Sequence, residues 1–399
     1  MENVSTQPSA AGGRYLGQGA DIFTLALKTG FLTFITLGIY RFWAKTRVRK
    51  FIWSSTELEG TRFEYTGTGL EKFLGFLVAV VILAIYLGII QMLLFFFGIS
   101  LFREAQSDAE AIAQSFAGFI TVLAVLPVIY FAVYRARRYK LARTRWRSIR
   151  FGMENAAWGY AMRALGYGFM SIISLGILMP LATFKLEKYM TDRSWFGDAK
   201  FEQHGRWTRL YGAMKHIFIG LGWLLGAAVF AAISATPLAA ILGFIGCFWI
   251  IIGSVYYNVH SFRYLTANKT LGGEITFKAE PFTSTVVLTY IGGSIAIALL
   301  LGTLGAIIAA SLAGPAMLAP EAMLDVGLIQ FIPLLIYIIV LVVAGAMSLA
   351  MIVQPIIRHY VETLAVINTD AFGQIAQRAS DEGADAEGFA DALDIGGAI

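Results

Sequence analysis

Long uncharged apolar runs constrain this chain more than any other feature of its sequence. One of them extends from Gly327 to Gln354 without a charged side chain, and about 18 such residues already suffice to cross the hydrocarbon layer of a bilayer. Hydrophobic residues make up 57% of the chain and charged residues 14%, whereas soluble domains average about 45–50% and about 25%. These features predict an α-helical integral membrane protein.

Basic residues divide the gaps between the apolar segments into two classes. The eight segments are approximately 22–43, 73–99, 116–134, 157–184, 217–234, 238–258, 284–311 and 328–357. Of the 31 Lys and Arg residues, 28 lie in the stretches 41–72, 135–163, 185–215, 259–282 and 358–399. Because Lys and Arg collect on the cytoplasmic side of a membrane, these five stretches are predicted to be cytoplasmic.

Eight crossings would place the strongly basic stretches 41–72 and 185–215 on opposite faces of the membrane. The conflict disappears if segments 22–43 and 157–184 are broken or re-entrant, so that each enters and leaves on the same side. Both termini are then cytoplasmic, and six crossings form three transmembrane hairpins at 73–134, 217–258 and 284–357. The alternative is that each of the two segments is a plain, slightly polar transmembrane helix.

The same two segments are copies of each other. Six of the ten residues of Gly30–Ile39 are identical to those of Gly168–Ile177, and the same offset continues without a gap to Gly67 and Gly205. An internal duplication explains this similarity better than chance, and such repeats are common in transporter-type folds. The predicted divisions are a disordered leader at 1–20, membrane repeats at 21–152 and 153–282, a third transmembrane hairpin at 283–357, and a cytoplasmic tail at 358–399, acidic and flexible at its end.

Phenylalanines recur at a regular distance within the basic gaps. An aromatic residue precedes Phe63, Phe151 and Phe201 by 12 positions in each case, and another precedes Phe277 by 13. Polar and apolar residues alternate around each Phe, which is typical of short β-strands. We therefore expect four short strands that pair into a small cytoplasmic β-sheet.

Several stretches of this chain resemble the signature of a known family. They are Thr36–Lys45, Arg47–Phe51, Thr56, Gly60, Phe63 and the C-terminal Glu387–Gly396. Over nearly the whole chain the sequence is similar to the YjgN-like bacterial inner-membrane proteins, catalogued as domain of unknown function 898. The resemblance implies a multi-pass protein of the bacterial inner membrane and implies no defined activity.

The sequence contains no recognisable catalytic motif. Its four histidines form no pair at helical spacing, and it has neither a phosphate-binding loop nor a nucleophile elbow. We therefore predict no catalytic residue, no metal site and no cofactor. A nucleic-acid partner is not expected either, because the basic residues border apolar spans, where membrane topology accounts for them.

Two groups of residues are candidates for contact with a ligand. The candidate gate or cavity group consists of Gly30, Thr33, Thr36, Gly38, Gly168, Ser171, Ser174 and Gly176. The candidate group for an anion or lipid headgroup consists of Arg47, Arg49, Lys50, Arg137, Arg138, Lys185, Lys188 and Arg263. The alternative explanation of the basic group is a topology signal beside anionic headgroups, where each cation contributes about 1 kcal/mol. The expected partner is the lipid bilayer, with anionic headgroups at its cytoplasmic face.

Two classes of function fit these features. The duplication and the broken segments favour a transporter- or channel-like protein for a small or anionic solute or a lipid. The alternative is a non-transporting membrane scaffold or lipid-organising protein. The alternative gains support because no Asp or Glu lies in the middle of an apolar segment, where ion-driven pumps place such residues.

The topology can be tested with single cysteines after Cys247, the natural one, has been replaced. On intact spheroplasts, Ser107→Cys should react with an impermeant thiol reagent and Gly205→Cys should not, because only Ser107 lies in an acidic gap. Both should react after permeabilisation, which serves as the control. Labelling of Gly205→Cys in intact spheroplasts would contradict the six-crossing topology.

Overall fold

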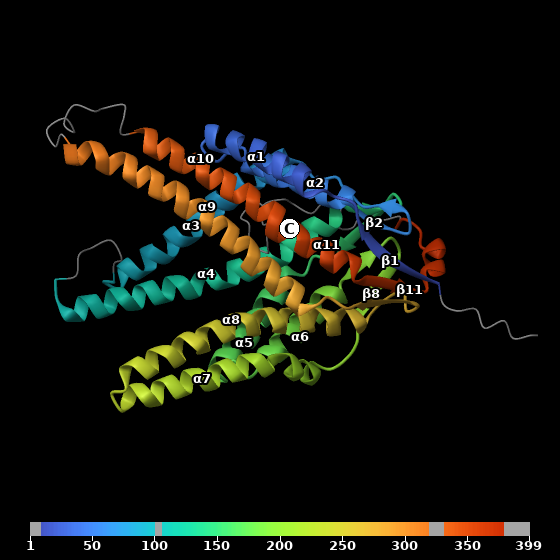
Figure 1. Ribbon diagram of the computed structural model, residues 1–399. Helices are drawn as coiled ribbons and strands as arrows, with labels where there is room; N and C mark the ends of the chain where they lie inside the picture. Colours follow the sequence, from blue (N-terminus) through green and yellow to red (C-terminus); the bar gives the residue numbers. More distant parts are fainter. Residues whose placement is uncertain (1–8, 100–105, 319–330, 379–399) are drawn as a thin grey trace, which may run out of the picture. The chain divides into compact units, whose positions relative to one another are not determined.

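The computed structural model describes residues 9–99, 106–318 and 331–378 (Figure 1). The chain divides into two compact units, which are described separately. The first unit consists of Met1–Phe63, Gly212–Ala267 and Phe277–Ile367, and the second of Glu64–Tyr211, Asn268–Thr276 and Asn368–Ile399. Each unit draws on both predicted repeats, so the compact units and the sequence repeats are different divisions of the chain. The acidic part of the expected tail, 379–399, lies outside the described residues.

Within the described residues, six helices are long and apolar enough to cross a membrane, which equals the number of crossings expected from the charge pattern. They are Gly69–Phe96, Asp108–Ala142, Trp207–Ala232, Thr236–Ala267, Thr283–Ile307 and Leu335–Glu362. These stretches lie in or overlap the helices α3 (Gly69–Phe96), α4 (Asp108–Ala142), α7 (Lys215–Ala232), α8 (Thr236–Ala267), α9 (Thr283–Leu318), α10 (Phe331–Ser348) and α11 (Gln354–Glu362).

The first two of these helices begin at capping residues. The Thr68 hydroxyl accepts the N–H of Glu71 at 3.2 Å, and the Ser107 hydroxyl accepts the N–H of Glu110 at 3.3 Å. A Ser or Thr followed three residues later by Glu is a sequence signal for a helix start, because these contacts satisfy N–H groups that have no partner within the helix. The polar ends of α3 and α4 are therefore fixed by their local sequence.

Helices α7 and α8 pack along a seam of glycines. A Cβ atom at Gly220 would lie 2.6 Å from Cγ1 of Ile250, and one at Gly253 would lie 2.9 Å from the backbone nitrogen of Ile217. Both distances are shorter than real contacts, so a side chain at either position would push the helices apart. Small residues of this kind let helices approach closely where the bilayer gives little hydrophobic drive for association.

Both copied segments are interrupted helices. The first forms α1 (Gly19–Ile35) and α2 (Arg41–Ser55), and the second forms α5 (Ala157–Ile173) and α6 (Met179–Thr191). The two helices of each pair contact each other. We call these pairs the α1–α2 and α5–α6 hairpins, and the turns between their helices the hairpin tips.

Short antiparallel strands complete each unit. In the first unit the strand order is β3-β2-β1-β11, with β1 (Ala10–Tyr15), β2 (Thr56–Leu58), β3 (Thr61–Arg62) and β11 (Leu364–Ile367). In the second unit the order is β4-β5-β6-β7-β8-β9, with β4 (Glu64–Tyr65), β5 (Thr144–Trp146), β6 (Ile149–Met153), β7 (Ser194–Phe196), β8 (Ala199–Gln203) and β9 (Lys269–Leu271). Strand β10 (Ile275–Ala279) follows β9 and pairs with it, Ile275 lying opposite Leu271.

Three of the four Phe-centred segments are strands. Phe151 lies in β6, Phe201 in β8 and Phe277 in β10, whereas Phe63 lies between β3 and β4 and donates its N–H to the Thr56 carbonyl at 3.0 Å. Each segment forms a β-hairpin with the strand that precedes it, namely β2, β5, β7 or β9. These preceding strands were not predicted from the sequence. The Glu59–Gly60 loop, with positive φ at both residues, is a two-residue turn of the kind that favours such hairpins.

The expected disordered leader is wrong for residues 10–20. Residues 10–15 form β1, whose Arg14 lies opposite Glu57 of β2 and whose Ala11 lies opposite Val366 of β11. Helix α1 begins at Gly19, so little unstructured chain separates it from β1. The small residues of this stretch resemble a linker, and only pairing with distant strands makes it a strand. Residues 1–8 lie outside the described part of the chain.

The glycine seam predicts different effects for two neighbouring glycines of α7. Gly220→Leu should destabilise the packing of α7 on α8 by about 1–3 kcal/mol, the usual cost of overfilling a packed contact. Gly222→Leu is the matched control, because a Cβ atom there meets no atom within 4 Å. Thermal unfolding in detergent micelles measures the difference. Equal unfolding temperatures for the two variants would contradict the seam.

Candidate functional site

The two hairpin tips have the same backbone geometry. The N–H of Gly38 donates to the Thr33 carbonyl at 2.7 Å, and the N–H of Gly176 donates to the Ser171 carbonyl at 2.7 Å. The backbone angle φ is +91° at Gly38 and +87° at Gly176, a region that only glycine enters without strain. These bonds close the last turns of α1 and α5, so the sequence duplication is also a duplication of local structure.

The candidate hydroxyl groups bind the backbone of their own hairpins. The Thr33 hydroxyl donates to the Thr29 carbonyl at 2.7 Å, and the Ser171 hydroxyl donates to the Tyr167 carbonyl at 2.8 Å. In the tips, the Thr36 hydroxyl accepts the N–H of Tyr40 at 2.9 Å and the Ser174 hydroxyl accepts the N–H of Leu178 at 3.0 Å. The hydroxyls of Thr33 and Ser171 thus bind backbone within α1 and α5, and those of Thr36 and Ser174 bind backbone in the turns that follow.

The candidate glycines occupy two kinds of environment. A Cβ atom at Gly30 would lie 2.7 Å from Cγ1 of Val342 on α10, and one at Gly168 would lie 3.5 Å from the hydroxyl of Tyr130 on α4. Gly30 therefore lets α1 pack closely on α10, whereas at Gly168 a side chain would make only an ordinary van der Waals contact with α4. Gly38 and Gly176 face open space, since a Cβ atom at either meets no described atom within 4 Å.

The candidate basic residues do not form a single group. Arg47, Lys50 and Lys185 are exposed, Arg49 and Arg138 are buried, and Arg137, Lys188 and Arg263 are half-buried. The Nε group of Arg138 donates to the Met153 carbonyl at 3.1 Å. Lys188 pairs with Asp192 at 2.9 Å. The exposed members Arg47, Lys50 and Lys185 are the ones available to a headgroup from the solvent side.

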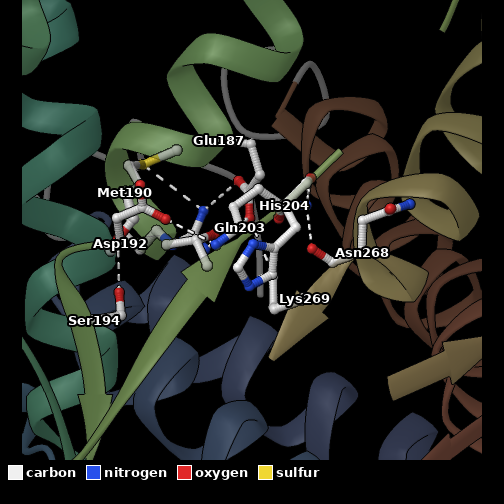
Figure 2. A network of polar contacts seen from close by, with 10 residues as sticks. Glu187, Met190, Asp192, Ser194, Gln203, His204, Asn268 and Lys269 are labelled. Atoms are coloured by element: carbon white, nitrogen blue, oxygen red, sulfur yellow. Dashed lines mark hydrogen bonds and ion pairs between the residues drawn. The ribbon is translucent and has the colours of Figure 1, made fainter. Parts of the chain in front are cut away.

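A cluster of charges around Glu187 was missed by the sequence analysis (Figure 2). The guanidinium of Arg137 on α4 binds the Glu187 carboxylate on α6 through two nitrogens, at 2.7 Å and 3.0 Å. The ammonium of Lys269 on β9 reaches the same carboxylate at 3.2 Å. These partners lie 50 and 82 positions from Glu187 in the sequence, so no local spacing signals the cluster.

The electrostatics of this cluster keep Glu187 ionised. Burial opposes the charge, but the cations of Arg137 and Lys269 outweigh it and hold the pKa of the Glu187 carboxyl well below its usual range. Burial also lowers the pKa of Lys269, although Glu187 partly offsets that effect. A carboxyl that stays ionised near neutral pH does not relay protons there. The role supported by the contacts is structural, because the ion pairs of Glu187 connect α6 to α4 and to β9.

Hydrogen bonds extend the cluster into the strands (Figure 2). The Asp192 carboxylate accepts the N–H of Gln203 at 2.8 Å, and the side-chain amide of Gln203 donates to the Asn268 carbonyl at 3.1 Å. The His204 ring lies 3.1 Å from the Thr270 hydroxyl. Within the described parts of the chain, no group of three or more His, Cys, Asp or Glu side chains is placed to hold a metal ion.

Comparison with known proteins identifies relatives of this chain. Residues 11–392 match the family described as bacterial protein of unknown function, DUF898. Inner membrane protein YjgN of Escherichia coli O157:H7 is 26% identical over 170 residues, which are 41% of this chain and 38% of that protein. Inner membrane protein YjgN of Salmonella typhimurium is 34% identical over 77 residues, 19% of this chain and 20% of that protein. The aligned regions thus span well under half of these relatives, and no solved structure matches.

The charge cluster predicts an acid-sensitive contribution to stability. Glu187→Gln should lower the unfolding free energy at pH 7 by about 1–3 kcal/mol, less than for a fully buried pair because the side chains are 21–30% exposed. Because the folded-state pKa of Glu187 is lowered, its contribution is complete above about pH 4.3 and is lost as the pH falls further. Unfolding of wild type and variant in detergent at pH 7 and pH 3 measures this. Glu202→Gln, which alters an exposed carboxylate of β8, is the control, and a difference between Glu187→Gln and wild type that is as large at pH 3 as at pH 7 would contradict the assignment.

Proposed function

We propose, from the premise that this chain belongs to the DUF898 family of bacterial proteins, that it is a lipid-organising protein of the inner membrane. In this proposal the α1–α2 and α5–α6 hairpins dip into one leaflet, which is the cytoplasmic one by the charge pattern, and the long helices cross the bilayer. The observation that carries the proposal is the apolar surface at both hairpin tips. Leu37 is 92% exposed and Leu175 is 86% exposed.

Large apolar side chains surround each of these tip leucines. The exposed ones are Leu32, Ile35 and Ile39 in the first hairpin, and Phe169, Met170, Ile172, Ile173 and Ile177 in the second. Contiguous exposed apolar surface of this kind marks contact with a membrane or with another protein. The backbone of each tip is compatible with lipid, because the bonds of Gly38 and Gly176 and of the Thr36 and Ser174 hydroxyls satisfy polar groups that lipid cannot.

Cations flank the tip of each hairpin. In the first hairpin, Lys28 on α1 and Arg47 on α2 lie nine and ten residues from Leu37, and Arg41 and Lys45 lie nearer, at four and eight residues. In the second, Arg163 on α5 and Lys185 on α6 lie twelve and ten residues from Leu175. At a rise of 1.5 Å per residue the separations of nine to twelve residues are about 14–18 Å, close to half of the roughly 30 Å hydrocarbon layer. Tips within one leaflet would therefore hold the cations at these separations at the headgroups, where anionic lipids attract them.

A transporter- or channel-like protein for a small or anionic solute or lipid is the second candidate. Paired helix breaks in a duplicated chain favour it, because such breaks often form binding sites in transporters. In this chain, however, the hydroxyls of the breaks bond to their own backbone, which leaves them less available to a solute. For this reason we place the lipid-organising function first.

Insertion of the tips can be measured with a fluorescent probe. Leu37→Cys or Leu175→Cys, made without Cys247 and labelled with bimane, is reconstituted into vesicles of phosphatidylethanolamine and phosphatidylglycerol. Nitroxide groups on the lipid acyl chains should quench the fluorescence strongly and aqueous iodide weakly, because the tips lie in hydrocarbon. Lys200→Cys, on an exposed position of β8, should show the reverse. Strong iodide quenching at both tips would overturn the proposal.

The physiological role is tested in a deletion strain whose lipid composition is compared with that of its parent. The wild-type chain should restore any difference, whereas Leu37→Asp with Leu175→Asp should not, because a carboxylate at each tip opposes insertion. Solute flux through the same vesicles distinguishes the second candidate. Flux that depends on the protein, with an unchanged lipid composition in the deletion strain, would favour transport.

A further inference from the structure

An apolar crevice opens on the membrane-spanning helices of the first unit. It has a volume of about 680 Å³ and lies between α8, α9 and α11. Its walls are mainly Val, Ile and aromatic side chains, with Asn258, Ser294 and the hydroxyls of Tyr290 and Tyr360 as its polar side-chain groups. The volume is in the usual range for a small-molecule site, and such sites are mostly apolar with a few placed polar groups.

The crevice lies near the start of α9 and extends along α8 from its middle toward its β9 end. On α8 its lining extends from Phe248 to Val259, and on α9 from Val286 to Ile295, in the first turns of the helix after β10. The eleven steps from Phe248 to Val259 correspond to about 16 Å of helix. This length is about half of the hydrocarbon layer, so the crevice fits the depth of one leaflet.

Arg263 lies on α8 beyond the crevice, in the direction of β9. The rings of Phe262 and Tyr360 meet there at 4.8 Å. Arg263 lies one turn beyond Val259 on the same face of α8, is half-buried, and forms no hydrogen bond or ion pair with the described residues. Its charge also acts on Glu280, but that carboxylate pairs with Lys278 at 3.0 Å.

We propose that this crevice binds one acyl chain of an anionic phospholipid and that Arg263 binds the headgroup phosphate. The crevice is lined mainly by apolar side chains of helices long and apolar enough to cross a membrane, so an acyl chain suits it, and the depth of one leaflet suits a chain whose headgroup stays at the surface. An Arg guanidinium matches a phosphate through paired hydrogen bonds. This site is separate from the hairpin tips and does not depend on their insertion.

The test uses the full chain in vesicles of phosphatidylethanolamine and phosphatidylglycerol. A small fraction of the phosphatidylglycerol carries a diazirine in one acyl chain, and labelled peptides are mapped after irradiation. Wild type should be labelled on the crevice residues of α8 and α9. Val287→Trp, which fills the crevice, should reduce this labelling at least about tenfold, equivalent to about 1.4 kcal/mol of binding. Leu288→Trp is the matched control, because Leu288 is 68% exposed and does not line the crevice.

Further variants in the same labelling experiment distinguish headgroup binding from acyl-chain binding and from misfolding. Arg263→Gln should remove the preference for diazirine phosphatidylglycerol over diazirine phosphatidylethanolamine while leaving acyl-chain labelling in place. Ile291→Phe gives a second crevice-filling variant if Val287→Trp is poorly folded. Leu37→Asp with Leu175→Asp should leave crevice labelling unchanged, which keeps this test independent of the proposed function. Equal labelling of Val287→Trp and Leu288→Trp, or crosslinks between the α9 helices of two chains in place of lipid labelling, would overturn the proposal.

Discussion

A helix that ends leaves backbone groups without partners inside the helix, and the hairpin tips of this chain satisfy some of these groups in the same way twice. Each tip closes its first helix with a glycine N–H that reaches back five residues, and each uses a Thr or Ser hydroxyl to accept the N–H of a residue in the turn. A helix can end within apolar surroundings when the backbone N–H and C=O groups at its end find hydrogen-bond partners in the adjoining turn. This local geometry lets the chain reverse direction between α1 and α2 and between α5 and α6.

The same constraint explains why strands begin where the apolar helices end. Backbone that leaves a helix must find new partners, and here it pairs at once in short antiparallel hairpins, such as Thr144–Trp146 with Ile149–Met153 after α4. The β-hairpin β7–β8 follows α6 and ends at Gln203, whose hydrogen bonds to Asp192 and Asn268 extend the Glu187 cluster. A buried charge is costly unless it is paired. Beside the strands, Arg137 and Lys269 both pair with the carboxylate of Glu187.

The sequence was informative wherever the structure depends on local composition. Uninterrupted apolar runs gave six helices long enough to cross, and the copied glycine and hydroxyl positions of Gly30–Ile39 gave the broken segments. It failed where structure depends on distant pairing: β1 forms only against β2 and β11, and the Glu187 cluster joins residues far apart in the chain. The glycine-containing turns Glu59–Gly60 and Gly272–Gly273 do signal the β-hairpins of β2 and β9, because residues suited to positive φ favour tight turns. The turn at Arg147–Ser148, between β5 and β6, contains no glycine and gives no such signal.

The distribution of polar groups also bears on the choice between transport and lipid organisation. An ion-driven transporter needs titratable groups at membrane depth, but the acidic residues of the six candidate spans lie in their first or last turns. Glu187 is held ionised by its two cations, and the hydroxyls of the breaks are engaged by backbone. Among the described residues, the tips and the crevice offer apolar surface, each with cations about one leaflet away or at its edge. Surfaces of that composition support the proposed lipid-organising function more than transport of a hydrated solute.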